Sequence, residues 1–156
     1  MDKKNIAIVI ILIIIVACIG FVAFNSTHNA KVGSSQVSIP NGFKVSSTSN
    51  HTAVLKSKQT TIIVNEREDN KTIDEIFDEY KKEHANYTVK ESSKKIGNTT
   101  LRSITLINST DNQTIHTNYY YQKDNKVYHI FMEGKPNNKA VEQIIKTTQK
   151  QTIPLF

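Results

Sequence analysis

The stretch Thr114–Glu133, TIHTNYYYQKDNKVYHIFME, decides the fold of this chain. Aromatic and β-branched residues alternate with polar ones on both sides of Asp124-Asn125, and this alternation predicts two strands, 114–123 and 126–133. Asp and Asn both tolerate the positive φ that a two-residue hairpin turn requires. The sequence therefore predicts an antiparallel hairpin with its turn at these two residues.

The register of this hairpin divides its side chains between two faces. With Lys123 opposite Lys126, the tyrosine pair Tyr121 and Tyr128 falls on an apolar face that belongs in the core. The other face mixes aromatic and polar groups, and it is the candidate ligand or partner patch: Tyr120, His129, Phe131, His116 and Glu133. In this register His116 lies opposite Glu133. Alternatively, a helix over residues 137–149 covers this face and buries the patch.

A helix is predicted in the segment KTIDEIFDEYKKEH, residues 71–84. Thr72 and Glu75 have the spacing of a capping box, in which each side chain hydrogen-bonds the backbone N–H of the other residue. Apolar residues then recur at positions i, i+3, i+4 and i+7, namely Ile73, Ile76, Phe77 and Tyr80. This single apolar stripe predicts a helix packed on a sheet.

Further strands and a second helix complete the fold prediction. Pro40-Asn41-Gly42 predicts a turn between two short extended pieces. Strands are expected at residues 53–57, 60–65, 88–92 and 99–108. After Pro136, one helical face collects Val141, Ile144, Ile145 and Thr148. The element order predicts an α+β fold, with a central antiparallel sheet of about six strands and helices packed on it.

This order of elements resembles that of the PsbP/Mog1-like family, to which several bacterial lipoprotein domains of unknown role belong. The matching residues are the opening motif Ile39-Pro40-Asn41-Gly42-Phe43 and the closing helix over residues 140–146. Family members commonly have Trp where this chain has Phe43. The resemblance implies a central antiparallel sheet with helices on both sides. It also implies an assembly factor or binding module, without an enzymatic activity.

An uninterrupted apolar run, residues 6–24, precedes all of these elements. As a helix it would be about 28 Å long, which is close to the hydrocarbon thickness of a bilayer. It is longer than the apolar core of a secretory signal, and Lys3 and Lys4 place residues 1–5 in the cytoplasm. We therefore expect a single-pass anchor in the lipid bilayer of the cell membrane, with the rest of the chain outside.

Two alternatives to a retained anchor stay open. Cleavage near Ala23 would release the domain, and the stretch Ile15-Val16-Ala17-Cys18 resembles a bacterial lipobox in which Cys18 would carry the lipid. The polar stretch 25–36 contains Ser, Asn and Gly without apolar periodicity, and it predicts a flexible linker. Residues 37–156 are then expected to form one extracytoplasmic α+β domain.

Composition limits the partners of this domain. Cys18 is the only cysteine, so the exported part can form neither a disulfide nor a cysteine-based metal site. Without Asp2, Lys3 and Lys4, the chain has 18 basic and 13 acidic residues, and this net charge of +5 favours anionic partners, although the lysines are scattered. Nucleic acid is excluded as a partner by the expected location outside the cell. An envelope protein or an acidic wall polymer is therefore the expected partner.

Asn-x-Ser/Thr triplets occur seven times, which is more than twice as often as the composition alone predicts, and all of them follow the apolar run. Such triplets are N-glycosylation acceptors in the surface loops of secreted proteins. The candidate acceptors are Asn25, Asn50, Asn70, Asn86, Asn98, Asn108 and Asn112.

The sequence carries no catalytic signature. It has no G-x-S-x-G motif, no glycine-rich phosphate loop and no histidine pair at the i, i+4 spacing of zinc proteases. We therefore predict no catalytic residues, metal or cofactor, and a non-enzymatic binding or assembly module. The alternative is an envelope hydrolase or metal-dependent enzyme that uses His116, His129 and Glu133. The charged run at residues 66–69 is expected to lie in a loop without a specific role.

Overall fold

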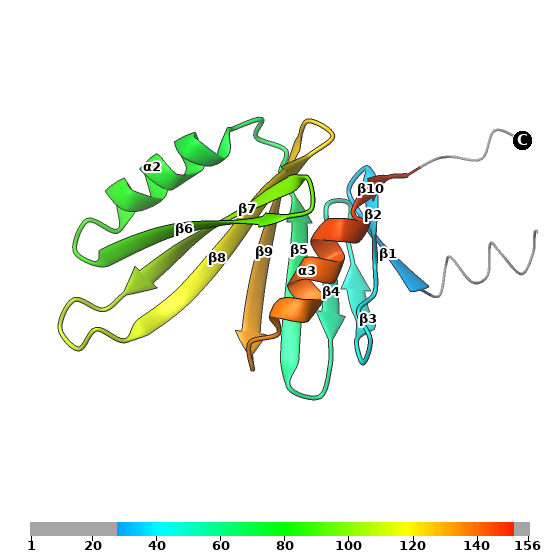
Figure 1. The fold of residues 1–156 in the computed structure, drawn as a ribbon, viewed down its shortest axis with the longest axis horizontal. Helices are drawn as coiled ribbons and strands as arrows, with labels where there is room; N and C mark the ends of the chain where they lie inside the picture. The colour runs from blue at the N-terminus through cyan, green and yellow to red at the C-terminus, as the bar shows by residue number, and fades with distance from the viewer. Residues whose placement is uncertain (1–27, 152–156) are drawn as a thin grey trace, which may run out of the picture.

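A computed structural model describes residues 28–151 of the chain (Figure 1). Its main element is a seven-stranded antiparallel sheet in the order β3-β4-β5-β9-β8-β7-β6. The strands are β3 (Lys44–Thr48), β4 (Thr52–Lys56), β5 (Thr60–Glu66), β6 (Thr88–Ile96), β7 (Thr99–Ile107), β8 (Thr114–Lys123) and β9 (Lys126–Gly134). The predicted α+β class with a central antiparallel sheet is confirmed, and this sheet has one strand more than expected.

A second, three-stranded sheet corrects the predicted domain boundary. It consists of β1 (Asn29–Val32), β2 (Ser35–Ser38) and β10 (Gln149–Lys150), so the prediction of a flexible linker is wrong for residues 29–36. Ala30 and Val32 are fully buried in the main core, and Gly33 supplies the positive φ of the turn between β1 and β2. Two apolar side chains among polar neighbours were too short a pattern to predict a strand. Residues 25–27 lie outside the described part.

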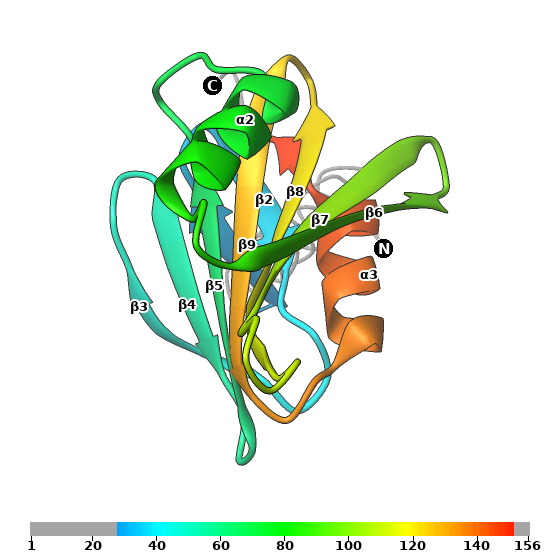
Figure 2. The same cartoon turned by 90° about the vertical axis from the view of Figure 1, so that its left-hand side faces the viewer.

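One helix covers each face of the seven-stranded sheet, which gives the molecule its layers (Figure 2). Helix α2 (Ile73–Glu83) packs on the face that carries Ile104, Tyr120 and Val127, here called the α2 face. Helix α3 (Asn138–Thr147) and the β1–β2 hairpin pack on the opposite face, here called the α3 face. The larger core lies on the α3 face, where the rings of Tyr121 and Tyr128 stack with centroids 4.9 Å apart.

The central hairpin has the predicted register over most of its length. Tyr121 lies opposite Tyr128, and Asp124 and Asn125 form the turn with φ values of 50° and 60°. The ladder ends at the pair Asn118 and Phe131, beyond which Figure 1 shows β8 and β9 diverging. The predicted pair of His116 and Glu133 is therefore wrong. His116 lies opposite Leu106 on β7 instead, and Glu133 lies opposite Thr61 on β5.

Local signals at both helices are confirmed. The Thr72 hydroxyl accepts from the N–H of Glu75 at 3.2 Å, and the Glu75 carboxylate accepts from the N–H of Thr72 at 2.7 Å. The predicted apolar face of the second helix is buried, and Asn137 caps its start by accepting from the N–H of Ala140. Strand β6 is longer than the predicted 88–92 because it pairs with β7 along its whole length.

Two further sequence predictions concern the charged run at residues 66–69 and the expected anchor at residues 6–24. Glu66 does not lie in a loop: it is the last residue of β5, and only 3% of its surface is exposed. The expected anchor at residues 6–24, including Cys18, falls outside the described residues. Between residues 28 and 151, neither helix is long and apolar enough to span a bilayer.

Candidate functional site

Tyr120, the first member of the predicted patch, lies beneath α2. Its side chain is 5% exposed, and its ring meets that of Phe77 edge to face at a centroid distance of 5.6 Å. The expectation that a helix could cover this face is correct in kind, but the helix is α2 and not residues 137–149. Because Tyr120 is part of the core, it is not available to a partner.

His129 lies beside Tyr120 at the same interface. The two rings stack with centroids 4.7 Å apart, and Nε2 of His129 lies 2.9 Å from Oδ1 of Asn118. Burial, together with the nearby Arg67 guanidinium, lowers the pKa of His129 to about 4. At neutral pH the imidazole is therefore uncharged and donates its Nε2–H to the Asn118 amide oxygen.

His116 connects the sheet to the C-terminal half of α2. Its Nε2 lies 2.7 Å from the hydroxyl of Tyr80, whose ring in turn stacks on His84 with centroids 4.1 Å apart. Burial lowers the pKa of His116, and the proximity of His84 adds to this shift. The uncharged ring thus completes a polar contact that fixes α2 on the sheet.

Phe131 belongs to an apolar strip on the α2 face that α2 does not cover. Its partner across the β5–β9 ladder is Ile63, and the partner of Ile63 on β4 is Val54. These three residues, called the apolar strip below, are each half-buried, and none is part of either core cluster. Figure 2 shows α2 across the upper part of this face, whereas the lower parts of β4 and β5 have no helix over them.

Sequence reasoning found Phe131 but missed its two neighbours. The signal was the apolar triplet Ile62-Ile63-Val64, in which the middle residue must point away from the core that the other two enter. Of the predicted patch, Phe131 belongs to the strip, whereas Tyr120 lies under α2 with His129 stacked on its ring. His116 contacts Tyr80 of α2, and Glu133 is exposed at the end of β9.

The polar residues of the predicted patch, His116, His129 and Glu133, are also the candidates for a metal or acid–base centre. Nε2 of His129 is bonded to Asn118 and Nε2 of His116 to Tyr80, so the two imidazoles are directed to different partners. Across residues 28–151, no three His, Cys, Asp or Glu side chains lie close enough together to hold a metal ion. In the same part of the chain, Glu133 forms no ion pair.

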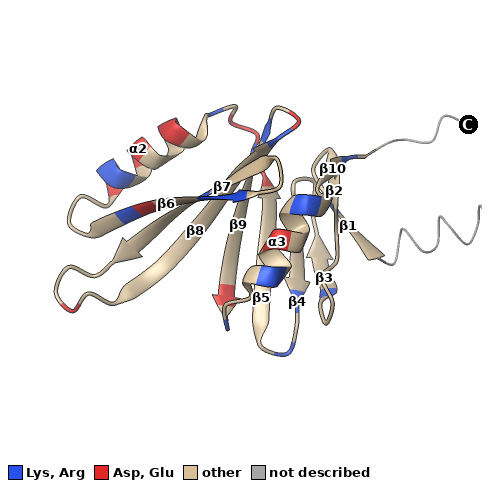
Figure 3. Ribbon diagram, viewed as in Figure 1, with Lys and Arg blue, Asp and Glu red and all other residues tan. Residues whose placement is uncertain are grey.

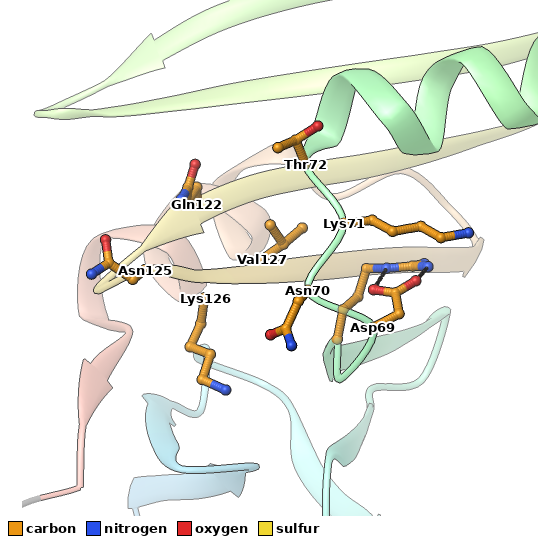
Figure 4. Close-up of a pocket in the computed structure, with 9 residues that line it drawn as sticks. Asp69, Asn70, Lys71, Thr72, Gln122, Asn125, Lys126 and Val127 are labelled. Carbon is orange, nitrogen blue, oxygen red and sulfur yellow. Dashed lines mark hydrogen bonds and ion pairs between the residues drawn. The ribbon is translucent and has the colours of Figure 1, made fainter.

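A small cationic pocket lies next to the start of α2 (Figure 4). It contains Arg67, Lys71 and Lys126, and each of these cations already faces a carboxylate. Arg67 is paired with Asp69, Lys71 with Glu79 at 2.6 Å, and Lys126 lies 3.8 Å from Glu66. Figure 4 shows Lys71 and Lys126 pointing in different directions, so the pocket offers no convergent cations for an anion.

No protein-family model matches this chain, and no curated protein matches it. The resemblance to PsbP/Mog1-like proteins therefore stays a prediction, and the function has to be argued from the surface described above.

Five of the seven candidate glycosylation sites lie on the surface of the described part of the chain. Asn50, Asn70, Asn86, Asn98 and Asn112 are exposed. Asn108 is half-buried, and its side-chain oxygen accepts from the N–H of Thr110 in a turn. Asn25 lies outside the described residues. Glycosylation itself stays a prediction for all of them.

We expect His129 to make stability depend on pH. Its pKa is about 4 in the folded state and about 6.5 in the unfolded chain, so the unfolded chain binds more protons between these values. The free energy of unfolding should therefore fall as the pH is lowered from 6.5 toward 4. Unfolding by urea at several pH values would measure this dependence, and NMR titration would give the pKa of the ring.

The control for this prediction is His129→Gln, whose amide can still donate to Asn118. This variant should lose part of the slope of stability against pH, while the lowered pKa of His116 leaves a smaller slope in place. A ring that titrates near 6.5 in the folded wild-type protein would contradict the prediction.

Proposed function

We propose that this protein is a non-enzymatic binding module, anchored in the cell membrane through residues 6–24, that docks an envelope protein on its apolar strip. In this proposal the domain lies outside the cell. Because β1 begins at Asn29, only residues 25–28 separate the anchor from the folded part. The domain would therefore stay close to the outer surface of the membrane, and its partner would be a neighbouring membrane or wall protein.

The observation that supports this proposal best is the composition of the uncovered surface. Val54, Ile63 and Phe131 lie directly across from one another on three adjacent strands, so they form one continuous apolar surface. Polar residues flank this surface on the same strands, among them Thr52, Thr61 and Asn65. An apolar centre with a polar rim is typical of a protein–protein interface, whereas isolated exposed apolar residues are not.

The alternative proposal, an envelope hydrolase or metal-dependent enzyme, has less support. It would need His116, His129 and Glu133 to converge on one substrate or metal ion. The two imidazoles instead hold α2 and Asn118 in place, and Glu133 lies on a strand that has diverged from β8. The two imidazoles named by this alternative are therefore used for packing, and the exposed Glu133 is not directed toward them by a shared ladder.

Site-specific photo-crosslinking in the native envelope tests the docking proposal. A photoreactive amino acid would replace Ile63 in the full-length chain, and Lys139, an exposed residue of α3 on the other side of the molecule, would be the control position. We expect one identified envelope protein to be captured from position 63 and not from position 139. Equal capture from both positions would overturn the proposal.

A second measurement uses substitutions to test whether the apolar strip is the reason for the contact. Ile63→Asp places a charge in the middle of the strip and should reduce co-purification of the captured protein at least about tenfold, a typical effect at the centre of an interface. Lys139→Asp adds the same side chain to the exposed first turn of α3 and should have no effect. Unchanged co-purification by the Ile63 variant would contradict the proposal.

A further inference from the structure

A groove lies on the α3 face, away from the apolar strip. Its floor comes from β6, β7 and β8, and one wall is the first half of α3. The groove has a volume of about 290 Å³, at the small end of the range for ligand pockets and sufficient for one or two sugar rings. The strands of its floor continue beyond the part of the α3 face that α3 packs against.

Side-chain hydroxyl groups dominate the floor of this groove. The hydroxyls of Ser92 and Ser103 lie 2.7 Å apart, and those of Thr105 and Thr117 lie 3.0 Å apart. Each hydroxyl can donate one hydrogen bond and accept two, so both pairs keep the capacity to bond a ligand above them. The floor therefore presents closely spaced groups that are donors and acceptors at the same time.

Two further polar groups in the groove have no partner within the described part of the chain. The hydroxyl of Tyr119 and the side-chain amide of Asn138 both line the groove, and neither makes a side-chain hydrogen bond to another residue between 28 and 151. Tyr119 also presents part of an aromatic ring, because its side chain is only half-buried. These two residues approach the groove from β8 and from α3.

Charge does not select an anion in this groove. Lys94 on β6 and Glu142 on α3 form an ion pair of 2.6 Å that connects the sheet to the helix at the groove. This pairing lowers the pKa of the Glu142 carboxyl, which stays ionised and neutralises the lysine. Figure 3 shows the acidic segment of α3 between two basic segments. The lining of the groove is therefore neutral overall.

We propose that this groove binds a short stretch of an uncharged glycan. Sugar hydroxyls match the hydroxyl pairs of the floor, and the apolar face of a sugar ring matches the half-buried ring of Tyr119. A peptide added as a strand would pair with the outer edge of β6, the last strand of the sheet, and would not lie over the floor of the groove, because the backbone groups of β7 and β8 are already used within the sheet. This site is independent of the docking of a protein on the apolar strip.

NMR of the ¹⁵N-labelled full-length chain tests the proposal directly. The chain would be held in micelles of a detergent without a sugar head group, and it would be titrated with cellotetraose and with the tetramer of N-acetylglucosamine. We expect at least one of them to produce saturable shifts in the amide signals of Ser103, Thr105 and Thr117. A weak ligand with a binding free energy of about −4 kcal/mol has a Kd of about 1 mM. If no saturable shifts appear up to about 20 mM of either tetramer, the proposal is overturned.

A matched pair of tyrosine variants tests the role of the groove. Tyr119→Phe removes only the unpartnered hydroxyl and should weaken binding of the same tetramer about fivefold, the effect of one neutral hydrogen bond. Tyr87→Phe makes the same change at an exposed tyrosine that does not line the groove, and it should leave the affinity unchanged. If both variants bind the tetramer with the affinity of the wild type, the proposal is contradicted. It is also contradicted if the chain binds dextran sulfate but neither neutral tetramer, and if this binding disappears at high salt.

Discussion

Replacing Glu66 with alanine should lower the free energy of unfolding by about 3–5 kcal/mol, the range for leaving a buried polar or charged network without one member. The Glu66 carboxylate accepts from the backbone N–H and the hydroxyl of Ser34, at 3.0 and 3.1 Å. It also accepts from the hydroxyl of Tyr128 at 3.4 Å, and burial raises the pKa of Tyr128 to about 12, so this donor stays protonated. The substitution leaves the N–H and the hydroxyl of Ser34 without this acceptor, and it reduces the contacts of the Tyr128 hydroxyl to its bond with Ser35.

Glu68 provides the matched control for this prediction. It is also a glutamate of the charged run 66–69, but its side chain is 71% exposed and, within residues 28–151, its ion pair is with His51. Glu68→Ala should therefore change the free energy of unfolding by less than about 1 kcal/mol. Urea unfolding of both full-length variants, followed by far-UV circular dichroism, would measure the difference. A difference of less than about 1 kcal/mol between them would contradict the role of Glu66.

The Glu66 contacts matter for the proposed function because they fix the hairpin that follows the proposed anchor. Ser34 lies in the turn between β1 and β2, so Glu66 ties this turn to the end of β5. The hydroxyls of Ser35 and Tyr128 add a bond of 2.6 Å at the same place. In the proposed arrangement, detachment of the hairpin would add residues 29–38 to the tether and move the domain away from the membrane on which its proposed partner lies.

The parts of the fold that the sequence predicted correctly depend on local patterns. The turn at Asp124-Asn125, the capping box of α2 and the apolar face of α3 each need only residues within about one helical turn or one hairpin. The strand register on either side of the turn follows from the alternation of side chains once the turn is placed. For these elements, local physical chemistry was sufficient.

The parts that could not be predicted depend on distant contacts. Glu66 is buried because Ser34, which is 32 positions earlier in the chain, supplies its hydrogen bonds. Strands β1 and β2 are stable because their few apolar residues enter a core formed by later segments. Neither fact leaves a periodic signal in the sequence, so the polar composition of residues 29–36 indicates a linker where the chain forms a hairpin.

The candidate site was likewise predicted correctly where local patterns decide it and incorrectly where distant contacts decide it. The alternation in β8 and β9 correctly assigned Tyr120, His129 and Phe131 to one face of the sheet. Which of them stays accessible depends on the direction in which α2 crosses that face, and the periodicity of a helix does not contain this direction. Helix α2 crosses over Tyr120 and Val127, so it buries one end of the patch and leaves Phe131 beside Ile63 at the other end.

Gly134 should be the glycine at which an added methyl group is most damaging to both proposed sites. It ends β9 with a φ of +86°, and a Cβ at this position would overlap the backbone oxygen of Gln59. The N–H of Lys135 donates to the same oxygen at 3.0 Å, and the Thr60 hydroxyl donates to the carbonyl of Lys135 at 2.7 Å. The backbone here cannot move away without breaking these bonds.

Gly42→Ala separates the effect of this overlap from that of the backbone conformation. Gly42 has almost the same φ, +82°, but a Cβ there would meet no atom within 4 Å. Both variants should lose about 1–2 kcal/mol of stability from the left-handed conformation, and Gly134→Ala should lose about 1–3 kcal/mol more from the overlap. Thermal unfolding of the two full-length variants would measure this, and equal losses would show that the chain yields at Gln59. Because Gly134 connects the strand of Phe131 to the helix that forms the groove wall, the overlap should also weaken binding at both surfaces, whereas the change at Gly42 should weaken neither.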